Sequence, residues 1–356
     1  MTRHFEVVNR EVIGKERWDT FVDSADEAWL WHRFDAQDAL STWPGKHDLS
    51  FAILDGESGE NIVAVVPLHL IESRIARLFS WNVLDSLGGP ACSNNVGERL
   101  KRKIMECVSE QLMMLARQFD ALRINLALSP MVPALCGNRF TVVNPLLVLG
   151  CQNIQTQIWA VDLRVGKDKV WKNLEGRART AIRKAQKEEV VVRPATANPE
   201  DLDIYYRLHC ETYLRTGVHP HPMPYFQAIW NNFLTKGYSY ILFAVHNDKV
   251  VAAENFGVYK KAAVYWTGAA SRDGLSLEAN SLLQWSAMQW MLEKGIEWYE
   301  TGEAFPHLKD GKLKGLNDFK KSFGGILYPC FRGQIDTMSR RHKIFKLVHQ
   351  FGKALS

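Results

Sequence analysis

ILFAVHNDKVVAAENFGVYKKAAVYW, residues 241–266, is the stretch that decides the fold. Polar turn residues divide it into three apolar runs, 241–245, 250–256 and 262–266, a pattern typical of consecutive β-strands. A segment with apolar residues at helical spacing follows over 277–293, and another apolar run follows over 296–300. The order of strands, helix and strand predicts an α/β unit with a sheet at its centre.

The first half of the chain repeats this order. Two apolar runs, 51–54 and 62–68, are joined by a turn, and a helical pattern over 100–119 then leads into a strand pattern over 121–126. The two copies are offset by roughly 175 to 190 residues, which indicates an internally duplicated unit. A chain of 356 residues is also long enough for two hydrophobic cores.

We therefore expect an α/β (α+β) protein with two domains in tandem, each with a mixed central sheet flanked by helices. The expected boundaries are 1–156 for the first domain and 157–330 for the second. The tail, 331–356, is expected to pack back on the first domain through the apolar face of a short basic helix. That face could instead meet a membrane surface, although the stripe is short for this use.

The composition is that of a folded protein, with 46% hydrophobic and 23% charged residues. The six cysteines are scattered, and no CxxC pair or suitably placed histidine indicates a metal site. The first residues, MTRHFE, lack the apolar core of a secretion signal, and no apolar run approaches the length of a membrane span. The expected location is the cytoplasm.

Positive charge is concentrated in two segments. Residues 169–193 carry eight Lys or Arg against three Glu, and residues 331–356 carry six against one Asp. Within the first segment a basic helix is expected over 168–187, where Arg179 and Arg183 lie one turn apart on one face. Two guanidinium groups on one face can bind phosphate oxygens. A solvated amphipathic helix is the alternative explanation.

A lysine between two aromatic residues marks the end of the second half, where residues 316–325 read LNDFKKSFGG. Phe319 and Phe323 flank Lys320, and a cation fixed in a partly dry pocket can stabilise the oxyanion of an acyl transfer. The alternative is a strand with exposed lysines.

These motifs resemble the Fem family of non-ribosomal peptidyltransferases. The resemblance lies in FKxxFG at 319–324, in RxxIRKAxK at 179–187, and in the segment 285–295 that leads into WYETG at 298–302. It covers residues 157–330 well and the first half loosely, through the strand at 51–53, the segment 66–68 and SLGGP at 86–90.

The resemblance implies two GNAT-like domains in tandem, with Lys320 stabilising charge at the transferred carbonyl and with Phe319 and Phe323 shaping the pocket. Members of the family move an aminoacyl group from tRNA to an amine of a cell-wall precursor, and looser relatives are presumed to use acyl-CoA. The phosphate-binding signature of acetyl-CoA enzymes, Q/RxxGxG/A, is missing; the nearest stretch, 270–276, does not satisfy it.

Glu254 stands in the middle of an apolar strand, where many Fem-like sequences carry a small or neutral residue. If Ala253 and Asn255 lie on the opposite face, Glu254 points toward the cleft and can act as general base for the attacking amine. An ion pair with a neighbouring lysine is an equally good explanation.

Trp266 and Tyr213 complete the candidate substrate-binding residues, although a tryptophan on a strand usually packs into the core. Tyr213 shares a predicted helix with His209, Glu211 and Arg215, and residues at this alternating spacing cannot all share one helix face.

We therefore expect an acyltransferase that moves an aminoacyl or acyl group to an amine of a phosphate-bearing, lipid- or nucleotide-linked precursor of peptidoglycan or polysaccharide. Arg179 and Arg183 would hold a phosphate of that acceptor or of a charged tRNA, the only nucleic acid expected; DNA is not. No metal or tightly bound cofactor is expected. Two alternatives stay open: an acyl-CoA-dependent N-acyltransferase of surface-polysaccharide biosynthesis, and a non-catalytic module that binds the precursor.

Overall fold

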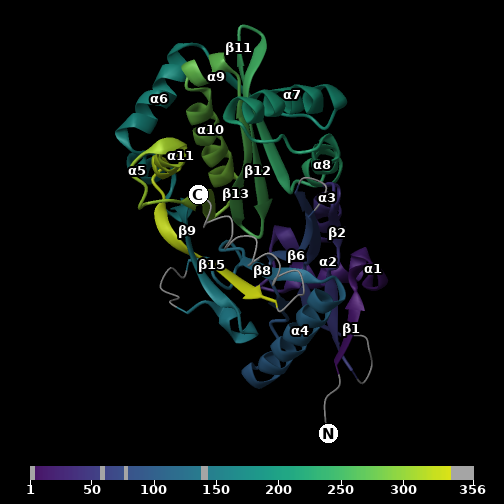
Figure 1. Cartoon of the computed structure of the whole chain (residues 1–356). Helices are drawn as coiled ribbons and strands as arrows, with labels where there is room; N and C mark the ends of the chain where they lie inside the picture. The colour runs from purple at the N-terminus through teal and green to yellow at the C-terminus, as the bar shows by residue number, and fades with distance from the viewer. Residues whose placement is uncertain (1–4, 57–60, 76–78, 138–142, 338–356) are drawn as a thin grey trace. The chain divides into compact units, whose positions relative to one another are not determined.

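The computed structural model describes residues 5–56, 61–75, 79–137 and 143–337 (Figure 1). The chain divides into unit 1, residues 1–155 and 330–356, and unit 2, residues 156–329. It passes into unit 2 within strand β9 (Gln152–Asp162) and returns to unit 1 within strand β15 (Ile326–Asp336). The tail helix expected to pack on the first domain falls on residues 338–356, outside the described residues.

Unit 2 holds the strands and helices expected for the second half. After β9 come η3 (Leu163–Val165), α5 (Lys167–Asn173), α6 (Gly176–Lys187), β10 (Val191–Pro194), α7 (Pro199–Thr216), α8 (Met223–Ile229) and a π-helical turn, η4 (Trp230–Leu234). Then follow β11 (Ser239–His246), β12 (Lys249–Tyr259), β13 (Ala262–Ala270), α9 (Arg272–Ser276), α10 (Ala279–Glu293), β14 (Trp298–Ala304) and α11 (Gly311–Lys321).

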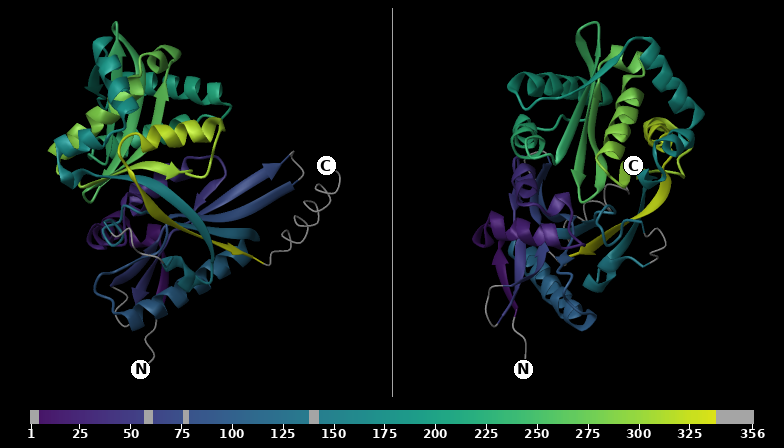
Figure 2. Two further views of the ribbon diagram at one scale, coloured as in Figure 1. Left: turned by 90° about the vertical axis from the view of Figure 1, so that its left-hand side faces the viewer. Right: turned by 180° about the vertical axis from the view of Figure 1, so that it is seen from behind.

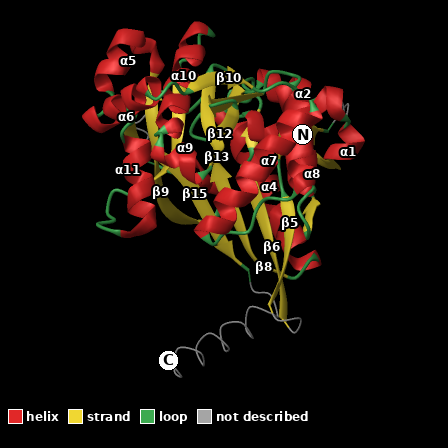
Figure 3. Cartoon of the chain, turned by 90° about the horizontal axis from the view of Figure 1, so that it is seen from above, coloured by secondary structure: helices red, strands yellow, loops and turns green. Residues whose placement is uncertain are grey.

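The sheet of unit 2 is mixed, with strand order β10-β11-β12-β13-β14-β9. Only the pair of β13 and β14 is parallel, because α10 connects these two strands and returns the chain to the same end of the sheet. Helix α10 packs on β11 and β12, and α7 packs on β12 and β13 from the other face (Figure 3). This arrangement confirms the predicted α/β class.

The core of unit 2 forms where α10 faces the sheet. Leu283 and Met288 of α10 are fully buried against Ala252 and Phe256, which alternate along β12. Helix α6 contributes Ala178, Ile182 and Ala185 at helical spacing to the same cluster, so its apolar stripe is covered and its charged residues face outward.

Strands β13 and β14 pair over only three positions. The parallel register joins Ala262–Val264 to Trp298–Glu300, although β13 continues to Ala270 and β14 to Ala304. Beyond Val264 the two strands therefore part, and the remaining edge of β13 needs other partners. Helix α7 supplies them: Thr212 Oγ1 accepts a hydrogen bond from Ala270 N (2.9 Å), and Arg215 Nη2 donates to Ala270 O (2.9 Å).

Unit 1 begins with β1 (Phe5–Asn9), α1 (Arg10–Ile13), α2 (Lys15–Ser24), η1 (Leu30–His32), α3 (Phe34–Ser41) and β2 (Lys46–Asp48). It continues with β3 (Phe51–Asp55), β4 (Ile62–Val66), β5 (His69–Ile75), β6 (Phe79–Gly88), β7 (Ala91–Cys92), α4 (Glu98–Gln118), β8 (Ala121–Leu128) and η2 (Pro145–Leu149).

One sheet of unit 1 has the order β1-β3-β4-β7, and β15, β8, β6, β5 and β2 follow one another in a second. Helix α4 packs on β8 (Figure 2). Its buried residues Ile104, Val108 and Leu112 share a core with Ile124 and Leu126. As in unit 2, a helix connects two parallel strands, β6 and β8. After a register shift between Asn82 and Val83, this pair stays in register from Val83 to Gly88, so these strands do not part.

The structure corrects one expected element. The basic helix expected over 168–187 is two helices, α5 and α6, because Leu174 is extended (φ −57°, ψ 140°) and ends the first. The amide of Glu175 donates to Ser322 O (2.8 Å) instead of to a carbonyl of α5. The helical sequence pattern runs through this point without a break, but a hydrogen bond to a distant part of unit 2 divides the helix in two.

Candidate functional site

A cavity of about 400 Å³ lies in unit 2 where β13 has parted from β14. Its walls come from the end of β13, the segment before α10, the C-terminal part of α7, and α11. The lining residues with polar side chains are Thr212, Arg215, Thr216, Tyr265, Glu278, Asn280 and Ser281, and Leu275, Leu316 and Phe319 provide apolar wall. A cavity of this kind can take a flexible ligand with both apolar and polar groups.

Glu254 lies behind this cavity wall and is fully buried. Its carboxylate oxygens accept hydrogen bonds from Asn280 Nδ2 (2.9 Å) and Gln284 Nε2 (2.9 Å), both on α10, and the Tyr265 hydroxyl is a third partner. Burial raises the pKa of Glu254 to about 8, and these hydrogen bonds oppose the shift. The expected alternation along β12 is present, because Ala253 and Asn255 lie on the other face.

The partners of Glu254 extend its network across unit 2. The Tyr299 hydroxyl donates to Gln284 Oε1 (2.5 Å), which fixes the side-chain amide so that its nitrogen faces Glu254. None of these partners was identified from the sequence. A weak signal was present, because Asn280 and Gln284 are polar residues one turn apart on a helix whose residues are mostly buried.

Lys320 lies at the end of α11, beside the part of β14 that has left β13. Its Nζ donates to Glu303 O (3.3 Å), and a Cβ on Gly302 would come within 2.8 Å of it, so glycine leaves room for the ammonium group. Burial lowers the pKa of Lys320, while the charges of Glu300 and Glu303 raise it. Lys320 is on a helix, not on the strand considered as the alternative.

The two aromatic residues beside Lys320 have different surroundings. Phe319 lines the cavity and touches Phe323 edge to face, with ring centroids 4.9 Å apart. Phe323 is 1% exposed and belongs to the core, so it supports Phe319 from behind. Asn317 braces the same helix, because its Oδ1 accepts from Trp159 Nε1 (2.9 Å) and Phe305 N (2.7 Å).

Arg179 and Arg183 are not among the residues that line the cavity. Arg179 Nη1 donates to the backbone oxygens of Lys172 (3.1 Å) and Leu174, the residues that end α5. The guanidinium of Arg183 lies 5.6 Å from the ring centroid of Trp171. The two arginines do share one helix face, but that face contacts α5; their role in binding phosphate stays a prediction.

Tyr213 and Trp266 lie apart from the cavity lining, in an aromatic cluster on the α7 side of the sheet. Trp266 Nε1 donates to the Tyr225 hydroxyl (2.9 Å), and the Trp266 ring packs against Phe233. The ring centroids of Tyr213 and His209 are 3.9 Å apart, and His209 is fully buried. Burial lowers the pKa of His209 to about 3, so it is neutral at physiological pH.

The segment that joins β13 to α10 is a short helical turn. Ser271 Oγ accepts from Gly274 N (3.1 Å), and glycine at 274 is required because a Cβ there would overlap Val251 O. Glu278, with φ 58°, precedes α10 and lines the cavity. The Glu278 side chain makes no capping hydrogen bond to the first amides of α10, and it places a carboxylate in the cavity lining beside them.

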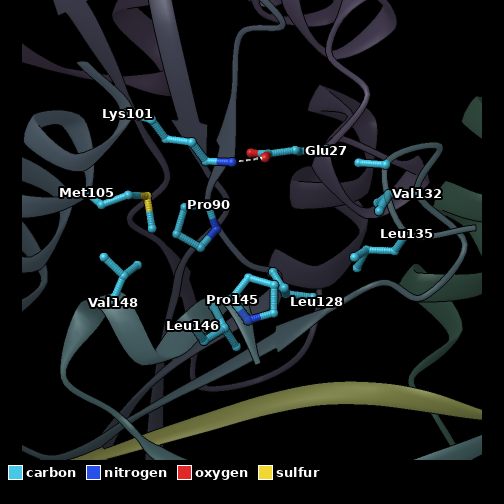
Figure 4. A pocket seen from close by; sticks show the side chains of 11 residues that line it. Glu27, Pro90, Lys101, Met105, Leu128, Val132, Leu135, Pro145, Leu146 and Val148 are labelled. Carbon is cyan, nitrogen blue, oxygen red and sulfur yellow. Dashed lines mark hydrogen bonds and ion pairs between the residues drawn. The ribbon is translucent and has the colours of Figure 1, made fainter. Parts of the chain in front are cut away.

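Unit 1 has a smaller cavity beside α4. It measures about 90 Å³, and its walls are mainly apolar side chains, with the ion pair of Glu27 and Lys101 at its edge (Figure 4). None of the residues predicted to act in the site lines it. Over the described ranges, no group of side chains is arranged to hold a metal ion, and no helix has the length and apolar character needed to cross a membrane.

Part of the chain matches a described domain family, and the fold is similar to those of several solved structures. Residues 172–321 match the sequence model described as the acetyltransferase (GNAT) domain. No curated protein matches the chain significantly. Among solved structures, FemX is similar with a TM-score of 0.69 and 16% identity, over 95% of this chain and 99% of that chain.

Two further similar structures have related folds. The C-terminal domain of a protein described as a lysylphosphatidylglycerol synthetase, from Agrobacterium fabrum, gives a TM-score of 0.59 and 18% identity over 90% of this chain and 91% of its own. A tandem GNAT protein from the clavulanic acid biosynthesis pathway is similar with a TM-score of 0.55 and 11% identity, over 94% of this chain and 98% of that chain. The fold confirms the resemblance to the Fem family and the tandem GNAT-like class, and the matched domain confirms the prediction of an acyltransferase.

Proposed function

We propose that unit 2 transfers an aminoacyl group from an activated ester to an amine of a phosphate-bearing cell-envelope precursor. One observation carries the proposal: beyond Val264, where β13 has left β14, β13 lines a cavity of polar and apolar residues that has a buried carboxylate network behind its wall. Lys320 belongs to α11, the helix that contributes Phe319 to the lining, and it lies beside β14. Acyl transfer to an amine needs a group that removes a proton and a cation or dipole that stabilises the oxyanion.

Lys320 is proposed as the oxyanion-stabilising group and Glu254 as the base. The lysine lies over Gly302, and within the part of the chain that the structure describes its Nζ donates one hydrogen bond, a long one to Glu303 O, so it has donor capacity left for a developing negative charge. Glu254 has amide and hydroxyl partners and, over the described residues, no ion pair with a lysine, which favours the base over the alternative considered from the sequence.

The chemistry of the cavity favours an aminoacyl ester as donor. Glu278 lines the cavity at the start of α10, where a diphosphate would meet a like charge, and Ser271 already occupies the amide of Gly274. A carboxylate here suits instead the α-ammonium group that an aminoacyl donor carries and a simple acyl-CoA lacks. The lysylphosphatidylglycerol synthetase, whose named product is an aminoacylated phospholipid, has a similar fold, which is in keeping with this donor.

An acyl-CoA-dependent N-acyltransferase is the second candidate, because the matched domain family is named for acetyl transfer. The two candidates share the acceptor and differ in the donor. They are therefore separated by supplying each donor to the same acceptor pool.

The test supplies purified protein and envelope precursors with either labelled aminoacyl-tRNA or labelled acyl-CoA. We expect transfer from the tRNA, and a loss of about 10²- to 10³-fold in kcat for Lys320→Ala, the range seen when an oxyanion donor is removed. Lys321→Ala is the matched control, since the neighbouring side chain points to Glu175 (3.9 Å). Transfer from acyl-CoA alone would establish the second candidate; binding without turnover from any donor would indicate a non-catalytic module.

A further inference from the structure

The proposed base cannot touch a substrate. Glu254 has no exposed surface, and the cavity wall in front of it is formed by two of its own hydrogen-bond partners, Tyr265 and Asn280. A proton that leaves a substrate in the cavity must therefore pass through one of these side chains. A carboxamide nitrogen donates but does not accept, whereas a hydroxyl can accept one proton while it gives up another.

A β-bulge aims Tyr265 at Glu254. In the register of β12 with β13, Glu254 faces Gly268, and Phe256 faces Tyr265, although Asn255 between them faces Thr267. The bulged strand therefore has one extra residue, Trp266, and the extra residue brings Tyr265 to the Glu254 face of the sheet. With strict alternation Tyr265 and Gly268 would lie on opposite faces.

Gly268 provides the space that the hydroxyl needs. A Cβ at this position would overlap Tyr265 Oη, and Gly268 itself lines the cavity. The phenol is therefore held across the backbone of its own strand, with its hydroxyl between the cavity and the carboxylate. Its ring packs on Phe256, with ring centroids 6.0 Å apart.

We propose that Tyr265 is the catalytic residue that receives the proton of the attacking amine, and that Glu254 acts only through it, as the group to which Tyr265 passes its own proton. This proposal rests on the proposed function. Tyr265 is then the contact with substrate, and Glu254 is a buried proton acceptor held ready by Asn280 and Gln284.

The step balances without another reagent. The amine nitrogen forms a bond to the donor carbonyl carbon and loses one proton to Tyr265 Oη, while the Tyr265 proton moves to Glu254. The bond from the carbonyl carbon to the donor ester oxygen breaks, and that oxygen takes up the proton by the reverse path. The products are an amide and an alcohol, and Tyr265 and Glu254 return to their starting states.

The groups that face Glu254 allow it to take part in this cycle. From α10 come the amides of Asn280 and Gln284 and from β13 the Tyr265 hydroxyl, and the charge of Glu254 also acts on Tyr299 of β14. Tyr205 of α7 feels the same charge but bonds Thr267 on the other sheet face, so it has no part in the cycle. None of these is a cation. Burial raises the pKa of Glu254 to about 8, so the carboxylate gains and loses a proton near neutral pH.

The test compares Tyr265→Phe, Glu254→Gln and the double variant in the full chain, under the donor and acceptor that the wild type uses. We expect kcat to fall about 100-fold in each single variant, with KM within about threefold, and no further fall in the double variant. The rise of kcat with pH, which has its midpoint near the Glu254 pKa of about 8, should disappear in all three. Tyr205→Phe is the matched control, because this buried tyrosine bonds Thr267 Oγ1 (2.6 Å) on the other sheet face.

The outcomes separate the proton path from the function. If Glu254→Gln loses the pH-dependent rise while Tyr265→Phe keeps it at near wild-type rate, the path through Tyr265 is wrong. If both variants behave like Tyr205→Phe while Lys320→Ala is inactive, the transferase stands and the Glu254 network is structural. If the wild type transfers no group from any donor, the proposed function itself fails.

Discussion

At the scale of single residues, the buried carboxylate makes stability depend on pH. The pKa of Glu254 is about 8 in the folded chain and about 4.5 for an ordinary glutamate, so between these values the folded protein keeps a proton that the unfolded chain has lost. Folding stability should therefore fall as pH rises through this interval. Glu254→Gln removes the titration and keeps the shape of the side chain.

Between about pH 5 and about pH 8 we expect the free energy of unfolding of the wild type to fall more than that of Glu254→Gln, by on the order of a few kcal/mol. Urea unfolding at each pH measures this difference. Glu188→Gln, at an exposed position of unit 2, should follow the wild type. Parallel curves for wild type and Glu254→Gln would show that the buried carboxylate does not titrate in this range.

At the scale of elements, Arg179 joins α5 to α6. Its guanidinium bonds the carbonyls of Lys172 and Leu174, which the end of α5 leaves without helical partners. Arg179→Ala should lower the free energy of unfolding by about 1 to 2 kcal/mol, whereas Arg183→Ala, at an exposed position over Trp171, should change it by less than about 0.5 kcal/mol. Thermal and urea unfolding of the two variants measure this difference.

The same pair of variants tests the phosphate role predicted from the sequence. If an arginine contacts a phosphate of the substrate, its change to alanine should raise the KM for that substrate. This rise in KM should become smaller as salt is added, because salt screens the contact in the wild type. Unchanged KM values with a destabilised Arg179→Ala would assign this arginine to the helix junction alone.

The sequence predicted most strands and helices of unit 2 but not how distant segments alter them. Apolar periodicity located the strands from 241 to 266, helix α10 and the duplicated order, because period and length reflect local burial. The break at Leu174 was missed, because a distant carbonyl, Ser322 O, causes it. The direction of the Tyr265 side chain was also missed. It depends on a single extra residue in the pairing of β12 with β13, and no local sequence pattern indicates this residue.

The candidate site was predicted unevenly for the same reason. Glu254 and Lys320 were predicted as candidates because a charge in an apolar strand and a lysine between phenylalanines are local anomalies. Asn280 and Gln284 carried a weaker anomaly on α10, and they became partners of Glu254 only through the packing of that helix on β12. Trp266 was a candidate by residue type, and the bulge turned it toward Tyr225.

At the scale of the whole molecule, each unit has a hydrophobic cluster of its own. Leu112 is fully buried in unit 1 and Leu283 in unit 2. Each change to alanine should cost about 2 to 5 kcal/mol, and the loss of amide protection should be concentrated in the unit that carries it. Hydrogen exchange read by mass spectrometry measures this, and an equal loss in both units after either change would contradict it.

The route of the chain through β9 and β15 has a consequence for biosynthesis. All of residues 156–329 leave the ribosome before residues 330–336, whose strand pairs with β8 through Arg123–Ala127. Domains usually fold in the order in which they are translated. Here the nascent N-terminal half must wait with the edge of β8 unpaired while the later half can already complete its own sheet, so the part that is synthesised first is the last to finish folding.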